Sequence, residues 1–474
     1  MTKTIEYLAA VLELTEPGAV TEPVTAPVGD RDRRYPDAEP ARGHDGRWEL
    51  PATSVAGSLR AALATVDPAL TLRVMGTVSG ATSTASALRV VGTRLLNPVT
   101  APDPEAIDER GTAIDRHRAA ARTSALRWVQ TLPAGTRFQV FLRWDDPDPD
   151  DLAAVLEILA SWQPLLGRGI SAGRGRCRIS RLDRGRLHLT TADGLRTFLT
   201  QSGPELVLAA ATESVPLGDA ADPETIHYTL AIVDPLHIGS GTVDDRTVRT
   251  TDTVGARARP GPAVSQIVRI GNKPVVPGRT LRGLLRSRSE FILRSIGIEA
   301  CADARCGTCP ACAVFGHAGG QASGRSVGRR SVFRVPDATI DQAVVARRTH
   351  AAIDDATIDQ AVVARRTHAA IDRFTGGAAD GLLFTEEVVE QGSFRLVIER
   401  FVGATDEEWR LVTALVALVV RDMHDGYLGV GAGTTRGHGT VEVVGGLGGT
   451  VLAEARRVLE RLRASGHIDV REAG

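Results

Sequence analysis

The order of the expected secondary-structure elements predicts an α+β protein made of two tandem ferredoxin-like domains, a fold shared by RRM-like RNA-recognition modules. The pattern strand, helix, strand, strand, helix, glycine-rich loop, strand occurs twice along the chain. The motif LPATSVAGSLR at Leu50–Arg60 also returns as VPGRTLRGLLR at Val276–Arg286. A chain of 474 residues is too long for one ordinary hydrophobic core. We therefore expect each copy of the motif to start a helix in its own domain.

The first domain is expected over residues 1–185. Apolar periodicity and turn signals predict strands at Thr4–Leu14, Leu88–Leu95 and Arg137–Trp144, and helices at Thr53–Ala64, Ala119–Thr131 and Asp150–Ser161. The long segment Glu16–Trp48 is rich in Pro, Gly, Asp and Arg and shows no sustained period. A loop of this length inside a compact domain is either disordered or functional.

The second domain is expected over residues 226–446, after a linker at 186–225 and before a helical tail at 447–474. It has predicted strands at Ile226–Val233, Val332–Val335 and Phe394–Glu399, and predicted helices starting within Val276–Arg286 and at Asp406–Val420. Two further matches support a duplication. Ile114-Asp115-Arg116 recurs as Ile371-Asp372-Arg373, and an ungapped alignment of Leu166-Gly167 with Leu428-Gly429 pairs Arg174 with Arg436 and Gly175 with Gly437.

A repeat of another kind lies inside the second domain. Residues 337–354 and 355–372 both read DATIDQAVVARRTHAAID. Because structural repeats drift in sequence, identity over eighteen residues indicates a recent tandem duplication or an artefact of sequence assembly. We give the segment 337–372 no functional role and expect one copy to loop out.

The composition excludes several classes of protein. The net charge is −1 and aromatic residues make up 4% of the chain, so any nucleic-acid site is a local basic patch and base stacking is not its main device. The opening residues lack a basic leader and a long apolar segment, and the longest apolar run, Leu411–Val420, is too short for a bilayer span. We expect a cytoplasmic protein with no membrane partner.

The two glycine-rich loops are candidate phosphate sites. Glycines let backbone N–H groups approach an anion, and arginines beside them neutralise it. The same chemistry applies at the start of the two motif helices, where hydroxyls and free N–H groups meet the helix dipole. The candidate RNA-binding residues are Thr53, Ser54, Arg60, Arg168, Arg174, Arg176, Arg279, Thr280, Arg282, Arg286 and Arg436. Plain tight turns and a solvated basic helix face remain the alternatives.

Four of the five cysteines are crowded together as Cys301, Cys306, Cys309 and Cys312. Their spacing, C-x4-C-x2-C-x2-C, predicts one structural Zn²⁺ held by four thiolates in an insertion at 301–317. His317 could replace one sulfur. An iron–sulfur cluster is the competing interpretation, but the fourth cysteine precedes the C-x2-C-x2-C run and no Cys-Pro follows it.

Several of these motifs together resemble the RAMP superfamily, and specifically the backbone subunits of type III CRISPR effector complexes. The resemblance is carried by IVDPLHIGSG at Ile232–Gly241, the motif at Val276–Ser287, the cysteine cluster, IDRFTGGA at Ile371–Ala378 and the terminal LGVGAGTTRGHG. The first half resembles the family more loosely. The family implies a ribonucleoprotein complex with CRISPR RNA, target RNA and other effector subunits, including a large polymerase-like signalling subunit, as partners. It also implies a zinc-binding insertion.

The resemblance further implies an antiviral-defence endoribonuclease. Many members cut target RNA with an aspartate in the loop between the first strand and the helix motif, with Mg²⁺ or Mn²⁺ as cofactor. Counting back from Pro51 places Asp37 nearest that position, with Asp32 in reserve, whereas the same count from Pro277 reaches Ala263 in a stretch without acids. The first domain is therefore expected to cut, and the second only to bind unless Asp244, Asp245 or Asp252 substitutes. An inactive architectural subunit and a CRISPR-RNA-processing endoribonuclease with a catalytic histidine are the alternatives.

Overall fold

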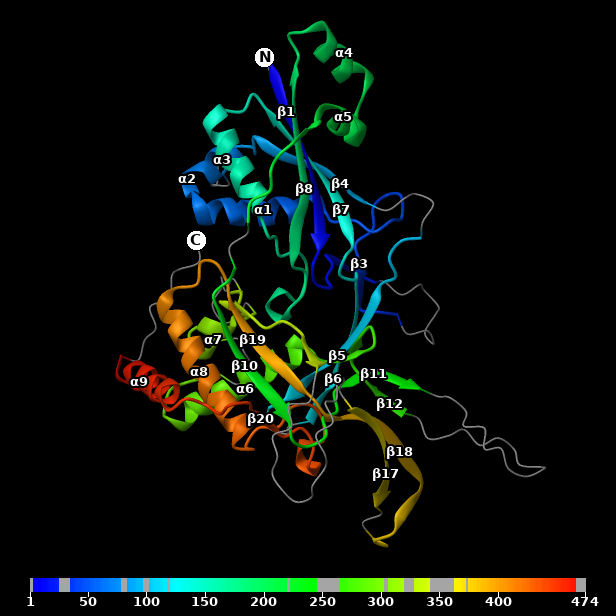
Figure 1. The fold of residues 1–474 in the computed structure, drawn as a ribbon, viewed down its shortest axis with the longest axis vertical. Coiled ribbons are helices and arrows are strands. Elements are labelled where there is room, and N and C mark those ends of the chain that lie inside the picture. The colour runs from blue at the N-terminus through cyan, green and yellow to red at the C-terminus, as the bar shows by residue number, and fades with distance from the viewer. Residues whose placement is uncertain are drawn as a thin grey trace, which may run out of the picture. The chain divides into compact units, whose positions relative to one another are not determined.

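The computed structural model describes residues 3–24, 35–77, 83–96, 102–116, 120–219, 222–244, 264–301, 306–318, 328–341, 362–371 and 374–465. It divides into two compact units (Figure 1). The first unit comprises Met1–Glu109 and Leu126–Asp222, and the second comprises Arg110–Ala125 and Pro223–Gly474. Each unit is described separately below.

The first unit is built on a mixed set of strands and helices with the ferredoxin-like order. The elements up to Ser214 are β1 (Thr4–Leu14), β2 (Thr21–Pro23), β3 (Ala38–Pro40), α1 (Ala52–Val66), α2 (Pro68–Met75), β4 (Leu88–Leu95), β5 (Ile107–Asp115), β6 (Ala120–Thr131), β7 (Arg137–Asp145), α3 (Pro149–Ala160), the 3-10 turn η1 (Ile170–Ala172), β8 (Cys177–His188), α4 (Ala192–Thr200), α5 (Gly203–Ala210) and β9 (Glu213–Ser214). Strands β5 and β6 cross the division between the units, because Arg110–Ala125 belongs to the second unit. The main sheet has the strand order β4-β7-β1-β8-β9, and every neighbouring pair in it is antiparallel.

Strand β1 is buried on both faces because helices cover both sides of this sheet. Leu8 and Leu12 lie in the core formed with α1, α2 and α3, whereas Ile5 and Tyr7 lie in a second core that contains residues of α5. Helices α4 and α5 fall within 186–225, the stretch expected to be a linker. That expectation differs from the structure, because Leu206 of α5 packs on the sheet.

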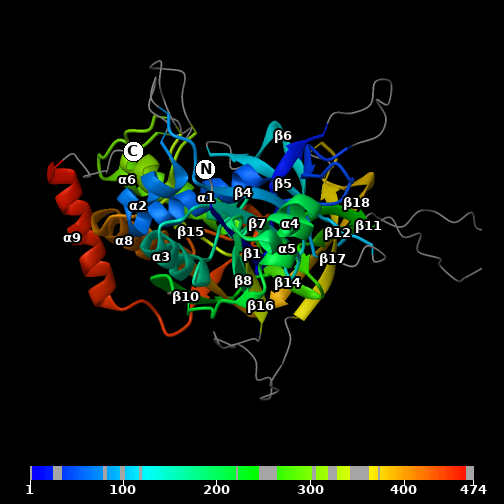
Figure 2. The ribbon, with the colours of Figure 1, turned by 90° about the horizontal axis from the view of Figure 1, so that it is seen from above.

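The second unit repeats the same topology with different decorations. Its elements are β10 (Thr225–Ile232), β11 (Gly239–Asp244), β12 (Val264–Ile267), β13 (Arg269–Ile270), β14 (Lys273–Val276), α6 (Gly278–Ser295), α7 (Pro310–Phe315), β15 (Phe333–Arg334), β16 (Ala338–Asp341), β17 (Val362–Ile371), β18 (Ala378–Gln391), β19 (Ser393–Arg400), α8 (Asp406–His424), η3 (Thr434–Arg436), β20 (Val441–Val443) and α9 (Gly449–Ser465). The main sheet follows β13-β14-β16-β19-β10-β20, with β15 also paired to β19. Helix α9 lies beside α8 (Figure 2). Ala455 of α9 packs against Ala414 and Ala417 of α8.

The two main sheets share one strand order. In the first, the strands that follow the pattern strand, helix, strand, strand, helix, strand are β1, β4, β7 and β8, arranged as β4-β7-β1-β8. In the second, the equivalent strands β10, β16, β19 and β20 are arranged as β16-β19-β10-β20. Both arrangements are the antiparallel ferredoxin-like order. The predicted fold class, α+β with two ferredoxin-like domains, is confirmed.

A second, four-stranded sheet accompanies each main sheet, and we call these the accessory sheets. Their strand orders are β2-β3-β6-β5 and β11-β12-β18-β17. In each, a hairpin inserted before the third strand of the main sheet pairs in parallel with a short strand, β6 with β3 and β18 with β12. The prediction of a helix at Ala119–Thr131 is wrong, because this stretch is strand β6. Its Ala- and Arg-rich composition favours helix locally, but pairing with β3 and β5 overrides that weak preference.

The eighteen-residue repeat contributes to two different strands. Strand β16 takes its residues from the first copy, and β17 takes its residues from the second copy. The intervening residues 342–361 lie outside the described part of the chain. The fold therefore uses the beginning of one copy and the end of the other.

Candidate functional site

The two glycine-rich loops make the same pattern of backbone hydrogen bonds. This pattern defines which residues of the two loops are equivalent. In the first loop, Leu166 N–H donates to Gly175 O at 2.8 Å and Gly175 N–H donates to Pro17 O at 3.0 Å. In the second, Val430 N–H donates to Gly439 O at 2.8 Å and Gly439 N–H donates to Pro235 O at 2.9 Å. Gly175 therefore corresponds to Gly439.

This correspondence corrects the alignment expected from the sequence by two residues. Gly167 and Gly431 also match, because an added Cβ would lie 1.9 Å from Ala19 O in the first and 2.4 Å from His237 O in the second. Counting forward from these glycines, Arg174 corresponds to His438 rather than to Arg436. Gapless matching failed because both loops contain glycines at every second or fourth position, so a two-residue shift still aligns glycine with glycine.

The arginine side chains of the two loops differ in solvent exposure and in their ion pairs. Arg168 and Arg436 are exposed, and the guanidinium of Arg436 lies 5.9 Å from the ring centroid of Phe384. Arg174 is held by Glu109 at 2.6 Å, with its side chain 12% exposed. Arg176 lies 4.0 Å from Glu16 and is partly buried. Arg168 and Arg436 are thus the loop arginines best placed to meet an RNA phosphate.

The arginine that ends each copy of the helix motif has a structural partner. Arg60 donates to Met75 O at 2.8 Å and to Gly76 O at 2.9 Å, at the C-terminus of α2. Arg286 donates to Gly316 O at 2.7 Å, at the C-terminus of α7. Both glycines have positive φ and pack against a backbone carbonyl, so Arg60 and Arg286 satisfy the last carbonyls of the following helix in equivalent places.

Two further motif arginines are also engaged. Arg282 donates to Phe315 O, and burial together with the nearby Arg286 lowers the pKa of Arg282 to about 10. Arg279 donates to Arg110 O at 2.6 Å. Arg286 is 7% exposed and also pairs with Glu290 at 2.9 Å. Arg286 is therefore turned into the unit, whereas Arg282 is half-buried.

The starts of the two motif helices are not capped by the expected hydroxyls. The N-caps are Pro51 for α1 and Pro277 for α6, and neither helix has a side-chain cap from its own first turn. Thr53, Ser54 and Thr280 lie within the first turns instead. In the second unit the Gly278 N–H donates to Asp337 Oδ1 at 2.7 Å, so a carboxylate already takes the place predicted for an anion.

Asp37 immediately precedes β3, an inner strand of the first accessory sheet. Its side chain is exposed, its N–H donates to Trp128 O at 2.6 Å, and its Oδ2 accepts from Trp128 N–H at 2.7 Å. This pair of bonds fixes the carboxylate against β6 and leaves the other oxygen available. The reserve candidate Asp32 lies outside the described residues.

The position equivalent to Asp37 in the second unit carries no acid. Thr21 pairs with Pro40 and the corresponding Gly239 pairs with Ile267, so the strand register matches Asp37 to Val264. The count from the proline reaches Ala263, one residue away and outside the described residues. Both side chains are hydrocarbons and can bind neither a metal ion nor a hydroxyl proton.

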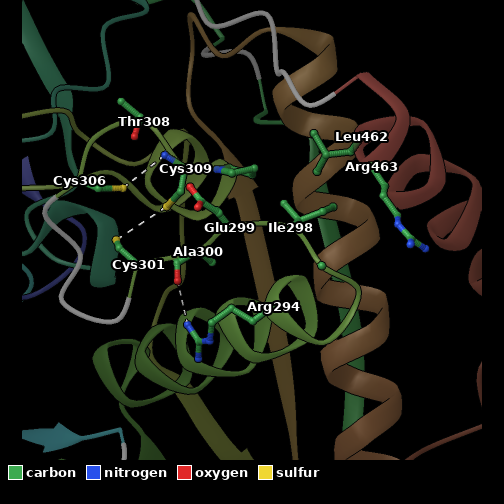
Figure 3. Close-up of a pocket in the computed structure, with 12 residues that line it drawn as sticks. Arg294, Ile298, Glu299, Ala300, Cys301, Cys306, Thr308, Cys309, Leu462 and Arg463 are labelled. Carbon is green, nitrogen blue, oxygen red and sulfur yellow. Dashed lines mark hydrogen bonds between the residues drawn. The ribbon is translucent and has the colours of Figure 1, made fainter.

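The four cysteine sulfurs converge beside the end of α6 and the start of α7. Cys301 Sγ lies 3.4 Å from Cys312 Sγ and 3.8 Å from Cys309 Sγ, and Cys306 Sγ lies 3.8 Å from Cys312 Sγ. Four thiolates around a tetrahedral Zn²⁺ with Zn–S bonds of about 2.3 Å would be about 3.8 Å apart. Figure 3 shows Cys301, Cys306 and Cys309 in a pocket that Leu462 and Arg463 of α9 also line. The four residues fit a metal such as zinc.

The surroundings of the cysteine cluster favour thiolates. Backbone N–H groups of Cys309 and Cys312 donate to Cys306 Sγ and Cys309 Sγ, each at 3.4 Å, and Arg286 donates to Cys312 Sγ at 3.4 Å. The hydrogen bond from Cys312 is the largest of the effects that lower the pKa of Cys309 to about 4. A bound Zn²⁺ would draw on these same donors to hold negative sulfurs in place.

Sequence reasoning missed one cluster of titratable residues. His368, Glu386 and His438 come from β17, β18 and the second glycine loop, and their side chains meet in the second unit. The sequence separates them widely, so no spacing motif marks them. The hairpin register, in which His368 lies opposite Phe384, brings His368 beside Glu386, and the second glycine loop brings His438 to the same carboxylate.

Comparison with protein families identifies the second half of the chain. Residues 229–442 match the family model described as the RAMP superfamily. This part of the chain is a RAMP domain. The matched residues run from β10 to β20 and so include the main sheet, the accessory sheet, the cysteine cluster and the glycine loop of the second unit.

Other comparisons add little to the RAMP assignment. A chain of a type III-B Cmr-beta cryo-EM structure in the apo state aligns with 36% of this chain and 96% of its own length, with 12% identity and a TM-score of 0.29. No curated protein matches the sequence. Within the described residues, no helix has the length and apolar character needed to cross a membrane.

Proposed function

We propose that this chain is a CRISPR-RNA-binding backbone subunit of a type III interference complex that presents the guide and cleaves target RNA at Asp37. The RAMP match of residues 229–442 supports the family, and the shared strand order extends the same architecture to the first unit. The observation that carries the cleavage proposal is the exposed carboxylate of Asp37, oriented by Trp128 and replaced by Val264 in the second unit. Type III effector subunits and target RNA are the proposed partners, in the cytoplasm.

RNA binding is proposed to use the sugar-phosphate backbone. Glycines at positive φ in both loops expose main-chain groups, and Arg168 and Arg436 stand beside them with exposed side chains. Thr53 adds an exposed hydroxyl in the first turn of α1. With aromatic residues at 4% of the chain, phosphate contacts account for binding better than base stacking does.

Cleavage is proposed to follow an in-line attack by the ribose 2′-hydroxyl on the neighbouring phosphate: the 2′-oxygen loses its proton and bonds to phosphorus, the P–O5′ bond breaks, and the 5′-oxygen leaves with a proton as a hydroxyl, which produces a 2′,3′-cyclic phosphate. Asp37 would orient the hydroxyl or hold the ion, because one of its oxygens is left free by the Trp128 hydrogen bond. A Mg²⁺ or Mn²⁺ ion, when bound, would neutralise the charge that develops on the phosphate. The second unit, with Val264 in the matching place, is proposed to bind without cutting.

The test compares Asp37→Asn with Asp45→Asn in the assembled complex. Asparagine keeps an acceptor for Trp128 N–H, so Asp37→Asn removes the charge without removing the backbone contact. Asp45 is an exposed acid of the same segment that accepts from Arg47 N–H at 3.0 Å, which makes it a matched control. We expect Asp37→Asn to lower the rate of one set of target cuts by at least about 100-fold, and Asp45→Asn to leave it unchanged.

Three outcomes separate the proposals. Loss of cleavage with normal CRISPR RNA binding supports the nuclease assignment. Unchanged cleavage at every site in Asp37→Asn would leave the architectural subunit as the correct description. Specific cutting of repeat RNA by the isolated wild-type chain would instead favour the processing endoribonuclease.

RNA binding is tested by its salt dependence. Each lost phosphate contact lowers the slope of log affinity against log salt by roughly 0.7 for single strands. Arg168→Ala and Arg436→Ala should each show this smaller slope. Arg60→Ala, which removes a helix-capping arginine, should lower the melting temperature and leave the slope unchanged. Equal slopes for all three variants would contradict the proposed contacts.

A further inference from the structure

His368, Glu386 and His438 form a compact group in the second unit. His368 Nε2 lies 3.2 Å from Glu386 Oε1, and His438 Nδ1 lies 3.6 Å from the same oxygen. One ligand atom from each residue lies within 4.8 Å of the others. The three residues come from the two strands of the hairpin β17–β18 and from the loop after η3, so the group ties the hairpin to the glycine loop.

Three atoms of this group are buried, and the described residues offer them no hydrogen bond. Glu386 and His438 are each 6% exposed, and Glu386 Oε1, His438 Nδ1 and His368 Nε2 have no hydrogen-bond partner in the part of the chain that the structure describes. A buried polar atom without a partner costs roughly 1–3 kcal/mol, and more when it is charged. Three such atoms that face one another indicate that something else satisfies them.

Protonated histidines do not account for the arrangement well. Among the described residues, no hydrogen bond joins either ring to Glu386 Oε1, although His368 Nε2 and His438 Nδ1 lie 3.2 and 3.6 Å from it. A neutral imidazole that presents a lone pair would repel the carboxylate, and one that presents an N–H would be expected closer than 3.6 Å. Two neutral imidazoles and one carboxylate are instead the donors of a divalent transition metal.

No nearby cation of the protein takes this role. Within the described part of the chain, the ion pairs of Glu386 are with His368 and His438 only. The neighbouring Arg366 pairs with Glu390 at 2.7 Å, and Arg436 lies over the Phe384 ring. An uncompensated buried carboxylate is strongly unfavourable.

We infer that the second unit binds a divalent transition-metal ion of the zinc type between His368 Nε2, Glu386 Oε1 and His438 Nδ1. Ligands at about 2.0–2.1 Å in a tetrahedral site are about 3.3 Å apart. The distances of 3.2 and 3.6 Å to Glu386 Oε1 are close to that separation. The site is separate from the cysteine cluster and contains no sulfur.

Three protein ligands leave at least one position for water or another ligand. His368 is the most accessible of the three, with its side chain 33% exposed, and its ring stacks on Phe384 at 5.2 Å. The free position is expected on that side, next to Arg436. A phosphate oxygen of bound RNA would be a suitable ligand there by charge.

The hairpin β5–β6 provides an internal control because it lacks these residues. An ungapped sequence alignment of the Ile-Asp pairs at 114–115 and 371–372 places Gly111 at the position of His368 and Val129 at the position of Glu386. Arg174, the counterpart of His438, is neutralised by Glu109 at 2.6 Å. The first unit thus closes the hairpin against the glycine loop with an ion pair, where the second uses the proposed metal.

The test measures bound zinc per full-length chain by mass spectrometry after dialysis against Zn²⁺. We expect Glu386→Gln and His438→Ala to bind one equivalent fewer than the wild-type chain. The matched control His227→Ala, which changes an exposed histidine of β10, should bind the same amount as wild type. Glu386→Gln preserves shape and guards against loss of folding, which circular dichroism checks.

A second readout uses thermal unfolding in the presence and absence of added Zn²⁺. Added Zn²⁺ should raise the melting temperature of the wild-type chain more than that of Glu386→Gln. The variant keeps the cysteine cluster but loses a ligand of the second site. Equal zinc content in wild type and both cluster variants would overturn the inference. Neither measurement involves RNA. Failure of the metal inference would therefore leave the proposed function untouched, and failure of the proposed function would leave the metal inference untouched.

Discussion

The residue that directly precedes Gly175 in the first glycine-rich loop differs in chemistry from the residue that precedes Gly439 in the second. In the first unit it is Arg174, which pairs with Glu109; in the second it is His438, which faces Glu386 and His368. The glycines around it, Gly175 and Gly439, keep the same contacts with a backbone carbonyl. The two units therefore agree where backbone packs on backbone and differ where side chains meet.

The same division holds elsewhere in the two units. Arg60 and Arg286 are equivalent because each satisfies carbonyls at the end of the next helix. By contrast, Asp37 and Val264 occupy equivalent places and share no chemistry. Repetition in this chain therefore indicates a shared fold, and the differences between the copies indicate candidate function.

Removing a metal held by the four cysteines should give the largest difference in melting temperature between the two units. Structural zinc contributes on the order of 10 kcal/mol in small zinc domains. We expect Cys309→Ser, or a strong chelator, to lower the melting temperature of the second unit by a large amount and to leave that of the first unit unchanged. Differential scanning calorimetry with two resolved transitions measures both.

Cys177→Ala is the matched control for this experiment. Cys177 is a buried cysteine of the first unit, and burial raises its pKa to about 12, so it stays protonated and unreactive near neutral pH. The variant should keep the wild-type zinc content. A chelator that shifted both transitions equally would contradict the assignment of the metal to the second unit.

Alanine at the equivalent glycines should destabilise the two units alike. An added Cβ would lie 1.9 Å from Leu166 O at Gly175 and 2.1 Å from Val430 O at Gly439, both at positive φ. Left-handed strain plus overpacking predicts a loss of about 2–5 kcal/mol for each variant. Urea unfolding of the two variants measures it.

Gly437→Ala distinguishes this register from the one that the sequence alone favours. Gly437 also has positive φ, but an added Cβ would meet nothing within 4 Å. It should cost only the strain of about 1–2 kcal/mol. If Gly437→Ala were as damaging as Gly439→Ala, the equivalence of Gly175 with Gly439 would be wrong.

Deletion of residues 342–359 should change the free energy of unfolding less than any of the substitutions above. The shortened chain keeps every residue of β16 and β17, because Gln360 then follows Asp341 just as Gln342 does now. We expect the free energy of unfolding to change by less than about 2 kcal/mol, since loop-closure entropy varies slowly with length. A large loss of stability would show that the added residues are needed to span from β16 to β17.

Much of the fold could be predicted from periodicity alone. Strands β1 and β4 have the expected bounds, and α3 and α8 begin within one residue of the expected positions. These elements pack apolar residues on the main sheets, so their patterns are strong. The exposed hairpin strand β6 has no such pattern, and its composition pointed to a helix.

The sequence predicted the cysteine cluster but not the roles of the arginines or the histidine cluster, and the reason is physical. The cysteines lie within twelve residues, so spacing alone indicates the metal site. The arginines of α6 have the same formal charge whether they face RNA or a carbonyl, and only the position of Gly316 O shows that Arg286 turns inward. His368 and His438 lie on a hairpin strand and a loop that only the tertiary fold brings together, which no local pattern encodes.

The division of β16 and β17 between the two copies of the repeat has a consequence at the level of the gene. Identical segments encoded side by side can exchange unequally, which removes or adds one whole copy at a time. Because one strand is taken from the start of the first copy and the other from the end of the last, each such event returns the same two strands. Chains that differ by multiples of this unit are therefore expected to share one fold, and length variation between close relatives should concentrate here.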